Sequence, residues 1–89
     1  MMTSAELSLY PLTANYEPII IDFIRLLRQQ PRVKVATNGL STQLTGAYAD
    51  VMAALTVAMQ PTMEGAVTTC SFVIKVLNVE VEPGEVVVV

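Results

Sequence analysis

An α+β fold is predicted for this chain by three features of its 89 residues. Segments that alternate apolar and polar residues, as strands do, occur near the start, the middle and the end. Between them lie two segments whose apolar residues are spaced three and four apart, as on one side of a helix. Asn38-Gly39, a pair that tolerates the positive φ of a tight turn, joins the two middle strands. The predicted order is strand, helix, strand, strand, helix, strand.

The first part of the chain supplies a strand and an amphipathic helix. Residues 4–10 alternate, with Ala5, Leu7 and Leu9 on one face, and Pro11 ends the strand. Asn15 is predicted to cap the helix that follows, and Pro31 to close it. The apolar stripe of this helix, which should lie on a sheet, consists of Tyr16, Ile19, Ile20, Phe23, Ile24, Leu26 and Leu27.

The second part supplies three strands and another helix. Strands are predicted over 32–37 and 40–45, on either side of the Asn38-Gly39 turn. A helix should follow over 47–60, with Pro61 beyond its end, and the outward side of this helix is apolar enough to meet another subunit. A long strand over 67–77 comes last. Residues 79–89, which end in four valines, form an extension or an extra strand.

This order of elements is the split βαβ pattern, which usually forms a ferredoxin-like βαββαβ fold. We therefore expect a four-stranded antiparallel sheet in the order 4-1-3-2, with both helices on one face and the other face open. The first strand would lie centrally, so Glu6, Ser8 and Tyr10 would point outward beside polar residues of the flanking strands. A chain of this length forms one domain, residues 1–89.

Composition limits the partners and the compartment. Five Lys and Arg against eight Asp and Glu give a net charge of -3, with no basic cluster for nucleic acid. No apolar run reaches the roughly 20 residues of a membrane span, so we expect no membrane insertion. Hydrophobic residues make up 53% of the chain, which for so small a domain favours the association of subunits. The start lacks the pattern of a signal peptide, and a single cysteine, Cys70, fits a reducing compartment, so cytoplasmic localisation is expected.

Catalytic patterns are scarce in this sequence. There is no histidine, so Ser-His and Cys-His nucleophiles are impossible. The carboxylates occur singly and the glycines are isolated, without a metal loop or a phosphate loop. We therefore expect a protein that is not an enzyme and that carries no cofactor and no metal.

Two segments resemble the thiamine/hydroxymethylpyrimidine-binding family, the YkoF-like group. They are the Leu-Tyr-Pro-Leu segment at 9–12 and the Asn-Gly-Leu-Ser-Thr hairpin at 38–42, within a likeness that runs from about Ser4 to Ile74. The resemblance implies a ferredoxin-like domain that binds thiamine or its hydroxymethylpyrimidine half without transforming it, for vitamin uptake or salvage. Some family members carry two repeats, so the resemblance implies a homodimer, which would supply the second repeat here, or a larger assembly such as a homotetramer. The chain departs from the family at Ala47 and Ala49, where acidic residues are common, and in its valine-rich end.

Seven residues are candidate ligand contacts: Glu6, Ser8, Tyr10, Asn38, Ser41, Thr42 and Gln43. The Glu6 carboxylate would accept hydrogen bonds from an aminopyrimidine, hydroxyls of the hairpin would bind ring nitrogens, and Tyr10 would stack on the ring. Plainer interpretations exist: Glu6 pairs with Lys75, the hydroxyls belong to the turn, and Tyr10 covers a subunit contact. Because strand side chains alternate, Thr42 should point opposite to Ser41.

Two other classes of function stay open. A structural or regulatory oligomerisation domain with no small-molecule ligand would explain the apolar outer side of the second helix and the valine end. An enzyme of thiamine metabolism would have to depend on Glu6 and Lys75, and its turnover would be lost in Glu6→Gln.

Overall fold

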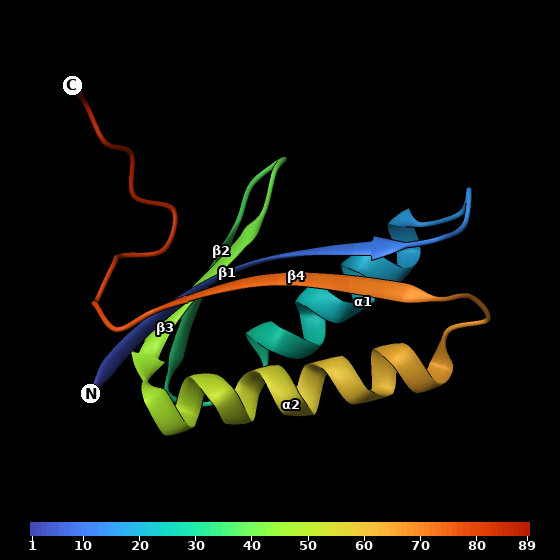
Figure 1. Ribbon diagram of the computed structural model, residues 1–89, viewed down its shortest axis with the longest axis horizontal. Coiled ribbons are helices and arrows are strands. Elements are labelled where there is room, and N and C mark those ends of the chain that lie inside the picture. The colour runs from blue at the N-terminus through green and yellow to red at the C-terminus, as the bar shows by residue number, and fades with distance from the viewer.

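The computed structural model describes residues 1–89 and has the predicted order of elements (Figure 1). The elements are β1 (Met2–Pro11), α1 (Glu17–Arg28), β2 (Val33–Thr37), β3 (Thr42–Ala47), α2 (Tyr48–Gly65) and β4 (Cys70–Leu77). All strand pairs are antiparallel, and the sheet order is β2-β3-β1-β4. This is the predicted order 4-1-3-2 read from the other edge, so the ferredoxin-like fold is confirmed.

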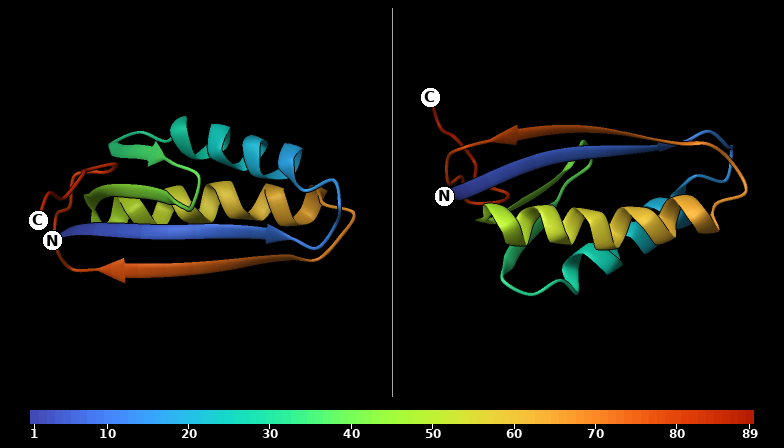
Figure 2. Two further views of the ribbon diagram at one scale, coloured as in Figure 1. Left: turned by 90° about the horizontal axis from the view of Figure 1, so that it is seen from above. Right: turned by 60° about the horizontal axis from the view of Figure 1, so that its bottom comes forward.

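Both helices lie on one face of the sheet and enclose the core with it (Figure 2). The alternation of β1 works as predicted, because Ala5, Leu7 and Leu9 are all buried against the helices. From α1 the core receives Phe23, whose ring meets that of Phe72 edge-on at a centroid distance of 5.2 Å. Neither helix is both long and apolar enough to cross a membrane.

Two helix ends differ from the prediction. α2 continues through Pro61 to Gly65, although Pro61 was expected beyond its end. A proline inside a helix leaves the carbonyl four residues earlier without its bond, and here that residue, Val57, is 52% exposed, so water can reach it. At α1 the N-cap is Tyr16 with no side-chain cap, so the Asn15 prediction was wrong. Pro18 in the first turn, with its preset φ, favours the helix start instead.

The segment after β4 covers part of the face that the helices leave free. Ser4 lies on this face and is nevertheless buried. Its Oγ donates to the carbonyl of Val79 at 2.7 Å and accepts from the N–H of Val81 at 2.8 Å. It also lies 2.9 Å from Oγ1 of Thr45 on the neighbouring strand. The outer face is therefore closed at this end of the sheet.

The same segment then continues across β3 and β2. The Gly84 N–H donates to Oε1 of Gln43 at 2.8 Å, and Lys34 forms an ion pair with Glu82 at 3.3 Å. No strand forms over residues 79–89, and Val86–Val89 lie exposed beyond the last of these contacts. Residues 79–89 are thus an extension that is fixed to the sheet as far as Gly84.

Candidate functional site

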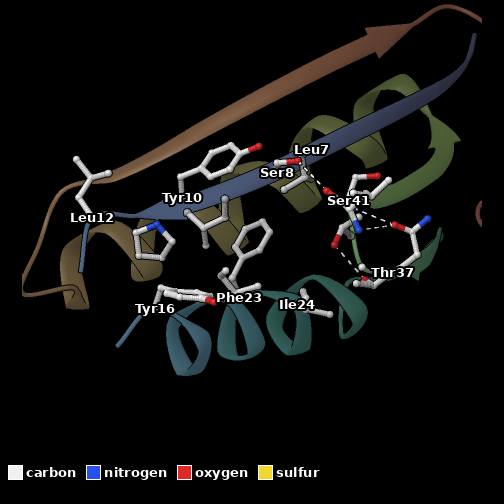
Figure 3. A pocket seen from close by; sticks show the side chains of 16 residues that line it. Leu7, Ser8, Tyr10, Leu12, Tyr16, Phe23, Ile24, Thr37 and Ser41 are labelled. Carbon is white, nitrogen blue, oxygen red and sulfur yellow. Dashed lines mark hydrogen bonds between the residues drawn. The ribbon is translucent and has the colours of Figure 1, made fainter. Parts of the chain in front are cut away.

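A pocket of about 440 Å³ lies between the end of β1, the start of α1 and the β2–β3 hairpin (Figure 3). It exists because β3 pairs with β1 only as far as Leu7 and Thr42, whereas β1 continues to Pro11. Beyond that point the hairpin diverges from β1 (Figure 1). The space left between them opens toward α1, where Phe23 forms part of the wall.

The pocket wall is apolar and uncharged. Among its 16 lining residues there is no Asp, Glu, Lys or Arg. Aliphatic side chains of β1 and α1 and the rings of Tyr16 and Phe23 contribute most of the wall, and polar groups come from the hairpin. Such a site suits an uncharged planar ligand whose faces need apolar contact and whose edge needs hydrogen bonds.

β1 offers unpaired backbone groups at this pocket. The N–H of Leu12 donates to the carbonyl of Thr69, which indicates that even-numbered residues of β1 direct their backbone groups to β4 and odd-numbered ones to β3. Leu7 meets Thr42 of β3, but the next odd residue, Leu9, has no β3 residue opposite it. Leu9 therefore presents a free N–H donor and C=O acceptor side by side.

A pair of threonines supplies side-chain hydroxyls to the pocket. Thr42 is buried and stands opposite Leu7, so it points to the helix side of the sheet, away from Ser41, as expected. Its Oγ1 lies 3.0 Å from Oγ1 of Thr37, the last residue of β2. Sequence reasoning missed Thr37, although pairing across the 38–41 turn places it directly opposite Thr42.

The hairpin tip is shaped by its own side chains. Oδ1 of Asn38 accepts the N–H groups of Leu40 at 2.8 Å and Ser41 at 3.0 Å, which is ordinary Asx-turn chemistry. Ser8 Oγ donates to the carbonyl of Leu40 at 3.2 Å and so ties the tip to β1. Asn38 therefore shapes the hairpin tip, and Ser8 links that tip to β1.

Glu6 lies on the opposite face of the sheet. It accepts a hydrogen bond from Ser41 Oγ at 3.1 Å and pairs with Lys75 Nζ at 3.3 Å. Gln43 faces the same side, and both line a smaller hollow of about 200 Å³ between the sheet and the C-terminal extension. Five of the seven predicted residues instead line the main pocket: Ser8, Tyr10, Asn38, Ser41 and Thr42.

Metal-binding groups are not gathered anywhere in the molecule. No three side chains among His, Cys, Asp and Glu lie close enough together to hold a metal ion. The chemistry that the main pocket offers is hydrogen bonding and apolar contact.

No protein-family model matches this chain, and no curated protein matches it. Solved structures do share its fold. A protein from Streptococcus pneumoniae aligns with a TM-score of 0.79 and 23% identity, over 91% of this chain and 90% of that one. A domain of unknown function, DUF77, from Bacillus cereus aligns with a TM-score of 0.72 and 16% identity, over 100% of this chain and 84% of that one.

A third similar structure carries a functional description. It is a candidate thiamine biosynthesis/salvage protein from Thermotoga maritima, which aligns with a TM-score of 0.67 and 12% identity over 83% of this chain and 82% of that one. Identities this low show the fold alone. The chain therefore shares its ferredoxin-like fold with a DUF77 domain and with a candidate thiamine biosynthesis/salvage protein.

Proposed function

We propose that this protein binds thiamine or its hydroxymethylpyrimidine half, without transforming it, in the pocket between β1, α1 and the hairpin. The observation that carries the proposal is the free backbone edge of Leu9 beside an uncharged, apolar pocket. A 4-aminopyrimidine has a ring nitrogen that accepts a hydrogen bond next to an amino group that donates one. The N–H and C=O of Leu9 offer the complementary pair.

The remaining contacts fit the rest of such a ligand. Aromatic and aliphatic walls, with Phe23 and Tyr16 among them, suit the faces of a pyrimidine ring. The hydroxyl pair of Thr37 and Thr42 can donate to a second ring nitrogen or exchange hydrogen bonds with the hydroxymethyl group. The ring would thus be held along two edges and both faces.

The charged half of thiamine would lie at the pocket mouth. No carboxylate lines the pocket, so a thiazolium cation gains nothing by entering it. Tyr10 and Tyr16 are about half exposed there, and aromatic faces attract cations. Most of the affinity should then come from the pyrimidine half. The family resemblance of the 38–42 hairpin and the fold shared with a candidate thiamine biosynthesis/salvage protein support this class of ligand.

Calorimetric titration with thiamine, hydroxymethylpyrimidine and oxythiamine tests the proposal. We expect saturable binding of the first two at micromolar or lower dissociation constants, with about one ligand per chain. Oxythiamine replaces the amino group with oxygen and reverses the donor and acceptor that face Leu9, so it should bind about tenfold more weakly or worse. Absence of heat with all three, from folded protein, would contradict the proposal.

A second candidate function is an assembly domain without a small-molecule ligand. The observation that favours it is the exposed valine end together with the unpaired outer edge of β4. A folded oligomer that binds none of the three ligands would select this candidate.

A further inference from the structure

β4 has an unpaired outer edge that is long and apolar. It is the last strand in the sheet order, and the pairing with β1 leaves the backbone groups of its even-numbered residues pointing outward. The strand has eight residues, and its one charged side chain, Lys75, is paired with Glu6 of β1. Long, mostly apolar edges are sites where an extended segment adds as a further strand.

The opposite edge of the sheet is a poorer site for strand addition. β2 has five residues, against eight in β4. Short edge strands offer fewer backbone groups to a further strand. The extension already passes this edge, with Glu82 bound to Lys34, yet its valines do not pair there.

The chain contains one segment with the properties of an added strand. Each residue of Val86–Val89 is at least 75% exposed, and no strand includes it. Valine is among the residues that most favour extended, half-buried positions, so leaving four of them in water is unfavourable. Glu85, which precedes them, forms no ion pair within the chain.

The valine end cannot pair with the β4 edge of its own chain. Gly84 lies over β2, where a Cβ added to it would stand 3.2 Å from Cβ of Ala36. Three strand spacings of about 4.8 Å separate β2 from β4, and a fifth strand would lie one spacing further, about 19 Å away. Residues 85–89 extend to at most about 18 Å, so no residue would remain to pair there. The valine end can therefore reach the outer edge of β4 only in another molecule.

We propose that Val86–Val89 of one copy adds as a fifth strand to the outer edge of β4 in a second copy. The backbone groups that β4 leaves free would pair with the valine segment, and the valine side chains would pack beside those of β4. Reciprocal exchange of the two ends would close a dimer, because each copy then both gives and receives a strand.

Two proline substitutions test the proposal through the geometry of a strand ladder. In a ladder, alternate residues direct their N–H groups to the partner strand, and the others direct them to solvent. We expect one of Val87→Pro and Val88→Pro to weaken self-association about tenfold, through loss of a ladder hydrogen bond, and the other to weaken it much less. Sedimentation over a range of concentrations gives the dissociation constants. Equal effects of both variants, no effect of either, or a monomeric parent protein would overturn the proposal.

Cross-linking identifies the receiving strand. In a Cys70→Ala background, one population carries Val88→Cys and a second carries Val73→Cys, and the two are mixed with a short bismaleimide. We expect a product of twice the chain mass that contains one chain of each kind. The matched control replaces the second population by one that carries Lys34→Cys at the β2 edge, which should yield little product. Equal yields at the two edges, or no product with Val73→Cys, would overturn the proposal.

Discussion

The two halves of β1 differ in what surrounds them, although they belong to one continuous strand. From Ser4 to Leu7 the strand has β3 on one side and β4 on the other, and the extension covers Ser4 from above. From Leu9 onward only β4 remains, and the side that faced β3 borders the pocket. The end of β3 thus divides β1 into two halves. The first half is paired on both sides, and the second has backbone groups that are free to bind a ligand.

The same residue type behaves differently in the two halves. Thr45 on the closed half is buried with its hydroxyl bonded to Ser4 and to the carbonyl of Thr3. Thr42 is buried beside the pocket, and its hydroxyl has only that of Thr37 as partner. The Thr45 hydroxyl is therefore bonded on both sides within the protein, whereas the pair of Thr37 and Thr42 at the pocket retains capacity to bind a ligand.

The largest expected effect is on stability, from a core truncation beneath the closed half. Leu44 is buried in β3, so Leu44→Ala should lower the free energy of unfolding by about 2–5 kcal/mol through the lost burial and the cavity left behind. Urea unfolding measures this change. Ligand affinity of the folded fraction should stay as in the parent protein. A selective loss of affinity at unchanged stability would remove the distinction between the two halves.

Matched threonine substitutions test the difference between the pocket half and the closed half. Thr42→Val should weaken binding of hydroxymethylpyrimidine by about 1–3 kcal/mol, because a polar group of the ligand then has no partner. Thr45→Val makes the same change on the closed half and should reduce stability while affinity is retained. Calorimetric titration and thermal unfolding of both variants give the two readouts. Equal affinities in Thr42→Val and the parent would exclude Thr42 from the site.

Loss of the Ser4 hydroxyl should release the extension. Ser4→Ala removes hydrogen bonds to Val79 and Val81, and we expect a loss of about 1–2 kcal/mol in stability. Hydrogen exchange should show faster exchange of the Val81 amide, with pocket affinity unchanged. Full protection of that amide in the variant would show that Ser4 does not hold the segment.

The smallest expected effect is that of Glu6→Gln. The Glu6 and Lys75 side chains are 45% and 64% exposed, and ion pairs this exposed contribute at most about 1 kcal/mol. Stability and affinity should both change by less than that. A large loss of affinity would instead place the ligand on the outer face of the sheet, and loss of a measurable turnover would favour an enzyme.

The fold could be predicted because strand and helix periodicities are strong and the turn chemistry of Asn38-Gly39 is specific. The alternation of strand side chains also predicted correctly that Thr42 and Ser41 point to opposite faces of the sheet. The free backbone edge of Leu9 could not be predicted, because it depends on where pairing between β1 and β3 stops. The sequences of both strands continue beyond that point without a signal that pairing ends. The cover over Ser4 was also missed, since residues 78–84 show no pattern that reveals which strand they cross.

Binding through the main chain of Leu9, as we propose it, limits how such a site can change. Any residue except proline supplies the same N–H and C=O, so replacing the side chain at this position does not by itself abolish the donor and acceptor. The length of β3 instead controls access to the backbone groups of Leu9. If β3 extended two residues further along β1, its own backbone would occupy these groups and seal the cavity. Insertions and deletions in the hairpin, rather than point substitutions, would then be the most direct route to gaining or losing the ligand.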